Sequence, residues 1–209
     1  MFTVLKLCVA ASGLFCAGVL MVVLIRTFAF GQKPAYARPR GSSFAGVMYA
    51  LGWGMLPWEK ESVAKHIWTY MGGILYHIGI LVTMLFLATL LLRISFPMIF
   101  LYLARVLLAI SLFCGVALLI KRILKPHLRS LSSGDDYWAN FLVDFFILWS
   151  LISTYAEKAL IPFLIIAIIT FIYIPFGKLR HCVFFFYSRI IFGTYFGKRG
   201  VLPHPSRKI

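Results

Sequence analysis

The chain has 209 residues, of which 62% are hydrophobic, and its mean hydropathy is +0.93. Only 13% of its residues are charged, against about a quarter in typical soluble domains. A soluble core of this size cannot bury so much apolar surface, so the composition excludes a soluble protein and indicates an integral membrane protein. The 21 Lys and Arg against 6 Asp and Glu give a net charge of +15, which fits nucleic acid, anionic lipid or an acidic partner until the charges are placed.

Five long apolar segments predict five transmembrane helices, at about residues 5–27, 67–92, 95–120, 137–156 and 159–186. Each has about twenty residues or more, which at ~1.5 Å per residue crosses a hydrocarbon layer of ~30 Å. The ten-residue alternation of β-barrel strands does not occur. We therefore expect an all-α integral membrane fold, a single five-helix domain over residues 1–209. The first segment is interpreted as a retained helix, since it is longer than a signal-peptide core and ends at Arg26 without a small-residue cleavage site.

The positions of the cations predict the orientation. Seventeen of the 21 Lys and Arg lie in three segments that would share one side of the membrane, at residues 26–66, 121–136 and 178–209. On the opposite side there are only Lys6, Arg93 and Lys158. The positive-inside rule then places the N-terminus outside and the C-terminus, with a basic tail at 187–209, in the cytoplasm. The excess charge becomes a topology signal with attraction to anionic headgroups. Nucleic-acid binding is the weaker alternative, because the sequence holds no recognisable reader module.

The cytoplasmic connection 32–66 is expected to hold a short interfacial helix that leads into the second span. Pro57 suits a first helical position, and the acidic residues that follow suit a first turn. Trp53, Trp58 and Trp68 fit an interfacial aromatic belt. The same segment is a candidate docking surface for a partner.

Histidines inside apolar segments are the main functional signal, because such residues in a span indicate function. His77 lies well inside the second span and Gly73 precedes it by one turn, while His181 lies at the cytoplasmic end of the fifth. Both imidazoles fall in the cytoplasmic half, where two facing histidines could ligate a b-type haem. Lys178 and Arg180 could neutralise its propionates. The alternatives are two unrelated histidines bonded to backbone carbonyls, and glycines that pack helices instead of a flat cofactor.

Three stretches carry a resemblance to a known family: Leu75-Tyr-His-Ile-Gly-Ile-Leu81, Lys121–Arg129 followed by Gly134-Asp-Asp136, and Pro175-Phe-Gly-Lys-Leu-Arg-His181. In this order they resemble the gamma subunit of respiratory nitrate reductase. That family includes the cytochrome b subunits of heterodisulfide reductase and of sulfate-reducer transmembrane complexes. Two further stretches, Gly54–Ser62 and Gly197–Pro203, look closer to the heterodisulfide-reductase-like branch. The resemblance covers four of the five spans and has the same five-helix, N-out architecture.

The resemblance implies electron transfer between membrane quinone and an iron–sulfur subunit on the cytoplasmic face, with His77 and His181 as axial haem ligands. It also implies neighbouring membrane or multihaem cytochrome c subunits as further partners. The two-haem members carry a second pair of histidines, and the matching positions here are Leu87 and Phe163, which cannot ligate iron. We therefore expect one haem b. His66 lies eleven residues before His77 and offers a less favoured second site with His127 or His204, or a bond to a propionate or quinone.

Two charged residues fall inside predicted spans. Asp144 is the sole acid in one, with Asn140 one turn earlier on the same face, and it either relays protons to a quinone or bonds a neighbouring helix. Arg105 either extends to the interface or has a partner on another helix.

These observations favour a haem b-binding subunit of a respiratory redox complex in the cytoplasmic (inner) membrane of a bacterium or archaeon. It would be a non-catalytic electron-transfer subunit. The rival hypothesis is an anchor or assembly subunit without a cofactor or quinone site of its own. A transporter is disfavoured, because no internal repeat or pair of broken helices is evident.

Overall fold

The computed structural model describes residues 2–30, 38–59, 63, 66–95 and 97–202. These residues form helices and connections and contain no strand, so the all-helical prediction is confirmed for them. By its contacts the chain divides into two compact units. Unit 1 comprises Met1–Val19 and Trp68–Leu179, and unit 2 comprises Leu20–Ile67 and Arg180–Ile209.

Three helices are long and apolar enough to cross a membrane: α1 (Phe2–Ala29), α4 (Ile67–Leu92) and α5 (Met98–Leu124). A fourth crossing follows if α8 (Leu160–Tyr173) and α9 (His181–Arg199), which are separated by a break, act as one span. Among the described residues the number is therefore three or four, and the chain is a membrane protein by this criterion.

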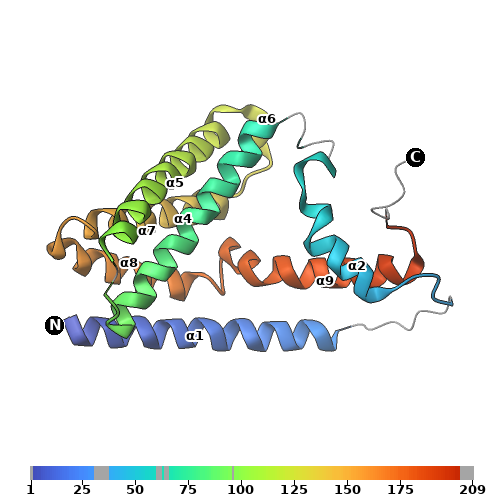
Figure 1. The fold of residues 1–209 in the computed structure, drawn as a ribbon, viewed down its shortest axis with the longest axis horizontal. Helices are drawn as coiled ribbons and strands as arrows, with labels where there is room; N and C mark the ends of the chain where they lie inside the picture. The colour runs from blue at the N-terminus through green and yellow to red at the C-terminus, as the bar shows by residue number, and fades with distance from the viewer. Residues whose placement is uncertain (1, 31–37, 60–62, 64–65, 96, 203–209) are drawn as a thin grey trace. The chain divides into compact units, whose positions relative to one another are not determined.

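The helix at the fourth predicted span, α7 (Gly134–Ser153), is not one of these apolar helices. Its polar residues lower its mean hydropathy, but several of them point into the bundle: Asp144, Ser150 and Ser153 are all buried. Eight of its twenty residues are buried, and it packs against both α5 and α8 (Figure 1). A helix enclosed in this way does not need the apolar surface of a lipid-facing helix.

Two apolar clusters hold unit 1 together. Phe146 of α7 stacks on Phe163 of α8, with ring centroids 5.5 Å apart and planes 16° apart. The cluster around this pair also contains Val9, Leu87, Leu164 and Ala167. A second cluster joins α4, α5 and α7 through Tyr76, Leu108, Val143 and Ile147. Between helices in lipid, such contacts stabilise by close packing more than by exclusion of water.

Charged and polar residues stabilise the ends of the helices in unit 1. Ser133 and Asp136 form a capping box at the start of α7, where acidic side chains suit the positive end of the helix dipole. Arg93 follows α4 in a left-handed conformation with φ of 57°. Lys6 of α1 donates from Nζ to the Leu90 carbonyl at 2.6 Å, which satisfies one of the last carbonyls of α4.

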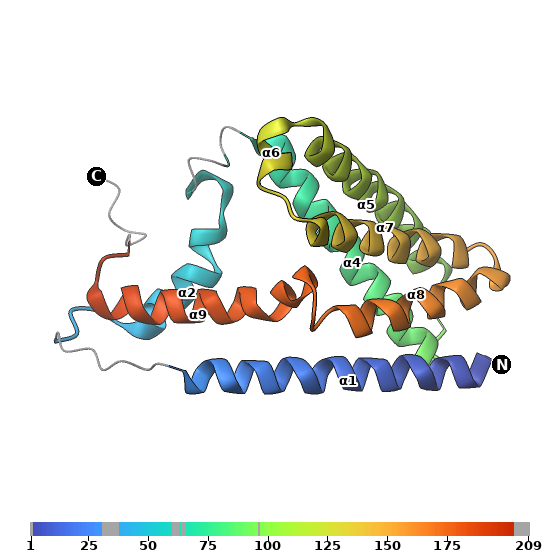
Figure 2. The same cartoon turned by 180° about the vertical axis from the view of Figure 1, so that it is seen from behind.

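Unit 2 is organised around the close crossing of α2 (Ser43–Leu51) and α9, seen in Figure 2. A Cβ on Gly193 would lie 2.5 Å from both the Gly46 carbonyl oxygen and Val47 Cα, so the two backbones touch. A Cβ on Gly197 would lie 2.8 Å from Gly46 Cα. These glycines permit a contact that larger residues exclude, as small residues do in membrane helix pairs.

The connection predicted at 32–66 differs in detail from the expectation. Its described part contains α2, which the sequence analysis did not anticipate, followed by the short 3-10 helices η1 (Trp53–Met55) and η2 (Pro57–Glu59). Pro57 is the first residue of η2. The residues after it that were expected to extend this helix lie largely outside the described residues.

Candidate functional site

His77 is exposed on α4, in unit 1. Its Nδ1 lies 2.7 Å from the carbonyl oxygen of Gly73, one turn earlier. Because a carbonyl can only accept, Nδ1 donates the hydrogen, and in a neutral imidazole the lone pair then lies on Nε2. A histidine that ligates a metal through Nε2 is usually oriented by this kind of bond from Nδ1. The bond to Gly73 is also the one expected for a histidine without a metal, so it agrees with an axial haem ligand and with the alternative of a histidine bonded to a backbone carbonyl.

The glycines around His77 fall into two groups. Within unit 1, a Cβ added at Gly72 or Gly73 would meet nothing within 4 Å. A Cβ at Gly79 would collide with the Ser111 side chain of α5. Gly79 is therefore a helix-packing glycine, whereas Gly73, which lies one turn from His77, leaves its surface open in this unit.

The second predicted ligand, His181, belongs to unit 2. It is exposed and is the first residue of α9, directly after the exposed Arg180. His77 belongs to unit 1 and His181 to unit 2, so their pairing around a haem stays a prediction. Among the described residues, no group of three or more His, Cys, Asp or Glu side chains could hold a metal ion, and a bis-histidine haem requires only two.

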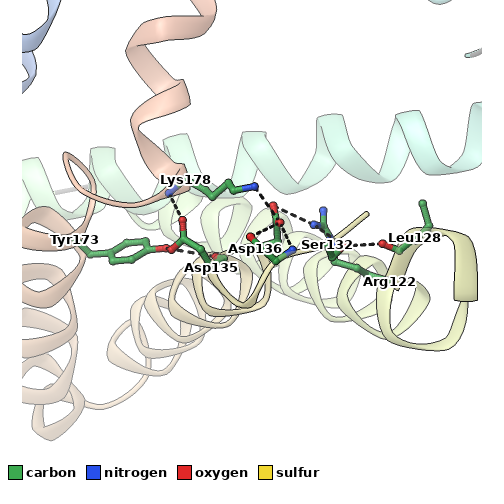
Figure 3. Close-up of polar contacts among 8 residues, drawn as sticks. Arg122, Leu128, Ser132, Asp135, Asp136, Tyr173 and Lys178 are labelled. Carbon is green, nitrogen blue, oxygen red and sulfur yellow. Dashed lines mark hydrogen bonds and ion pairs between the residues drawn. The ribbon is translucent and has the colours of Figure 1, made fainter. Parts of the chain in front are cut away.

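Lys178 was expected to meet a haem propionate, and the structure gives it acidic partners within unit 1. Its Nζ lies 3.0 Å from Asp136 Oδ2, and its backbone N–H donates to Asp135 Oδ2 at 2.9 Å. Asp135 also accepts from the Tyr173 hydroxyl, and Asp136 pairs with Arg122 of α5 at 3.3 Å. Figure 3 shows both carboxylates between these partners. The cluster fastens the ends of α5 and α8 to the start of α7.

The electrostatics of this cluster favour ionised Asp136. Burial by itself raises the pKa of Asp136, but bonds from the Ser133 N–H and from Lys178 outweigh it and lower the pKa to about 2. Arg122 adds a second cation. Half of the Lys178 side chain is exposed, so solvent screens its contribution.

The second candidate feature is a polar cluster in the core of unit 1, around Asp144 of α7. Asn140 donates from Nδ2 to Asp144 Oδ2 at 2.9 Å, which confirms that the two residues share a helix face. The Tyr76 hydroxyl of α4 donates to the Asn140 backbone carbonyl at 3.2 Å. The same hydroxyl accepts from Asn140 Nδ2, also at 3.2 Å. Three side chains from two helices thus meet at one buried place.

Arg105 has a partner across helices, which decides between the two hypotheses for this residue. Its Nε donates to Thr154 Oγ1 at 3.2 Å, and its Nη2 donates to the Thr154 backbone carbonyl at the end of α7. Its guanidinium carbon lies 4.0 Å from the ring centroid of Tyr155. The partner lies in the same chain.

Two of the remaining histidines, His66 and His127, lie outside both clusters. His66 is exposed one residue before α4, and its backbone N–H donates to the Val63 carbonyl at 2.9 Å. His127 is exposed on the short helix α6 (Pro126–Ser130). His204 lies outside the described residues.

Two contributors to the buried cluster were missed by the sequence analysis. Tyr76 was noted only as a neighbour of His77, and Gly115 of α5 was not singled out. A Cβ added at Gly115 would collide with Asp144 Oδ1 and with the Tyr76 ring, so only glycine fits at this position. The sequence offered one signal for Tyr76. Consecutive helical residues point about 100° apart, so a tyrosine directly before His77 points to a different side of the helix from the histidine.

Comparison with known proteins adds no assignment: no protein-family model matches the chain, and neither a curated protein nor a solved structure matches it.

Proposed function

We propose that the chain is a haem b-binding membrane subunit of a respiratory redox complex. It would transfer electrons between the quinone pool and an iron–sulfur subunit on the cytoplasmic face. The observation that carries this proposal is the exposed position of His77 one turn from the open surface at Gly73, with the Nδ1 bond to the Gly73 carbonyl placing the imidazole lone pair on Nε2. His181 is the proposed second ligand.

The positions that would hold an outer haem support a single cofactor. Leu87 of α4 and Phe163 of α8 lie in one buried cluster, with exposed fractions of 2% and 0%. Phe86 also contacts Phe163, with ring centroids 5.7 Å apart. The second and fifth predicted spans therefore meet at this level, and closely packed apolar side chains fill the place.

The proposal includes five crossings, with the N-terminus outside and the C-terminus in the cytoplasm. The three apolar helices supply the first three, the enclosed α7 the fourth, and the broken pair of α8 and α9 the fifth. The distribution of Lys and Arg supports the orientation. Anionic lipid and the iron–sulfur subunit are the proposed partners of the basic face, in the inner membrane of a bacterium or archaeon.

A haem with two axial histidines supplies one-electron transfer and leaves no open coordination position. The residues of the chain would hold the ring, orient His77 through Gly73, and provide charges near the propionates. Arg180 is the more available cation, because Lys178 already contacts Asp136. Asp144, Asn140 and His66 remain the proposed proton or quinone residues.

The test is a spectrum of the full chain purified from membranes in lipid nanodiscs. We expect a reduced-minus-oxidised b-type α band and one extractable haem per chain. His77→Ala and His181→Ala should each abolish the band. His127→Ala is the control, since this histidine is also exposed and its loss should leave the band unchanged.

Other outcomes select other functions. A folded chain without haem would favour the anchor or assembly subunit. Two haems per chain would restore a ligand role for His66, which His66→Ala would test. A band that survives both ligand substitutions would refute the ligand assignment.

A further inference from the structure

Asp144 is an acidic side chain that lies deep in unit 1, and no cation of the described residues is paired with it. It is 5% exposed and lies near the middle of α7. The ion pairs in the described part of the chain involve Asp136 and not Asp144. A carboxylate in hydrocarbon without a cation is costly, and binding a proton removes that cost.

The contacts of the two carboxyl oxygens differ. Oδ2 accepts from Asn140 Nδ2 at 2.9 Å. Oδ1 is buried and has no hydrogen-bond partner among the described residues. When Asp144 is protonated, we expect the hydrogen on Oδ1, because Oδ2 already accepts a hydrogen bond from Asn140. An unbonded buried oxygen of this kind needs a ligand, and a proton is the smallest one.

The surrounding residues form a site for this oxygen. Oδ1 faces the place where Gly115 lacks a side chain. Tyr76 borders the same space, and its hydroxyl lies within interaction range of the carboxyl. The Tyr76 hydroxyl donates to the Asn140 backbone carbonyl and accepts from Asn140 Nδ2, which leaves one lone pair on its oxygen to accept a hydrogen from Oδ1 of the protonated acid.

From these contacts we propose that Asp144 is an exchangeable proton-binding site inside the α4–α5–α7 bundle. Asn140 and Tyr76 act as positioning residues, and Gly115 provides the space. The carboxylate takes up one proton at Oδ1 and releases it as the pH rises. This proposal stands on the protein contacts alone and does not require haem.

The titratable groups around the site are few. From α4, Tyr76 faces it, and from α5, Cys114 packs against the Tyr76 cluster. Along α7, Asp136 lies two turns earlier and already pairs with Arg122 and Lys178. The only titratable residue of α8 is Tyr173, which bonds Asp135. None of these groups places a cation next to Asp144 to stabilise its carboxylate. We therefore expect Asp144 to be neutral at lower pH.

The experiment is infrared spectroscopy of the full chain in nanodiscs, titrated from about pH 5 to about pH 9. The chain has three aspartates, Asp135, Asp136 and Asp144, so carboxyl-labelled ¹³C-aspartate identifies their bands without mutation. We expect one carboxylic C=O band that shifts with the label and in D₂O, and that declines as pH rises. Asp144→Asn should remove it, and Asp136→Asn should leave it unchanged.

The same carboxylic band tests whether Asn140 and Tyr76 position the Asp144 carboxyl. Asn140→Leu removes the donor to the carboxylate and should move the midpoint of the titration upward by about one pH unit. Tyr76→Phe should shift the band frequency, because it removes the acceptor for the Oδ1 hydrogen. A merely structural role would change stability without moving the midpoint.

Two results would overturn the proposal. The first is the absence of a labelled carboxylic band over the whole range, which means that Asp144 stays ionised. The second is a band of constant intensity to about pH 9, which means a permanently neutral acid. If Asp144→Asn fails to fold, Asp135→Asn and Asp136→Asn in the labelled chain assign the band to Asp144 by elimination. Loss of the α band in the histidine variants is a separate readout, so either proposal can fail without the other.

Discussion

Arg105 of α5 binds Thr154, the residue that caps the C-terminal end of the enclosed helix α7, through Nε to Oγ1 at 3.2 Å and through Nη2 to the backbone carbonyl. The negative end of a helix dipole and its free carbonyls are suitable partners for a guanidinium. Lys6 binds the end of α4 in the same way, by donating a hydrogen bond to the Leu90 carbonyl. Both cations lie near helix ends where they satisfy backbone groups, which explains their presence in a predominantly apolar sequence.

Replacement of Arg105 should therefore destabilise unit 1. Arg105→Met removes both bonds and leaves a carbonyl at the end of α7 without its donor, at an expected cost of about 1–2 kcal/mol. Arg105→Lys keeps the charge but not the two-atom contact, so its loss should be smaller. Thermal unfolding in nanodiscs measures the effect, with the exposed Arg129→Met of α6 as control. Equal stability of all three variants would contradict the capping role.

The cluster at the start of α7 should make stability depend on acid pH. The pKa of Asp136 falls from an ordinary value of 3.8 to about 2 in the folded chain. Because the folded pKa is lower, the stabilisation is fully present above the unfolded pKa and is lost as pH falls from about 4 to about 2. Solvent screening reduces the contribution to the order of 1 kcal/mol. Asp136→Asn should flatten this part of the stability profile.

The control for this pH effect is Asp144→Asn, which leaves the ion pairs of Asp136 intact. Its profile between about pH 4 and about pH 2 should keep the slope of the parent chain. A parent chain without any slope in this window would contradict the assigned role of the Asp136 pairs.

The crossing of α2 and α9 depends on the absence of side chains. Gly193→Leu would drive a side chain into the backbone around Gly46 and Val47, and it should unfold unit 2 or separate the two helices. Gly18→Leu on α1 is the matched control, because a Cβ there meets nothing within 4 Å. Limited proteolysis of both variants measures the difference. Equal resistance to proteolysis would show that the contact contributes nothing.

The fold could be predicted where the sequence is uniformly apolar. The charge-free runs placed α4 and α5 within a few residues of their bounds. The predicted span 159–186 ran through a break, because hydropathy does not register that Pro175 lacks a backbone N–H. The helix α2 was missed, since a nine-residue helix in a connection has little periodicity of its own. Its partner helix did carry a signal, the Gly193–Gly197 spacing of a close helix contact.

The site was predictable in its residue types and less so in its arrangement. Asp144 and Asn140 were paired correctly because i and i+4 share a helix face. The contribution of Tyr76 depends on how α4 and α7 cross, which no local pattern specifies. Arg105 shows the same limit, since the pattern offered two explanations and only the position of Thr154 decides between them.

The open surface at Gly73 gives a final prediction for the haem proposal. Gly73 lies four residues before His77 and shares its face of α4, whereas Gly72 lies about 140° away from that face. Within unit 1 both positions have open space, so Gly73→Leu and Gly72→Leu should fold equally well. A leucine at residue 73 would occupy the surface on which a flat cofactor must lie. We therefore expect Gly73→Leu to lower haem content at least several-fold, and Gly72→Leu to leave it nearly unchanged.

Extractable haem per chain and the α band measure the two leucine variants side by side. Gly79→Leu, which collides with Ser111, should fail to fold and so marks the behaviour of a glycine whose role is helix packing. Loss of haem in a Gly73→Leu chain that still folds would therefore report on the cofactor surface and not on the bundle. Equal haem in the residue 72 and 73 variants would remove Gly73 from the proposed site.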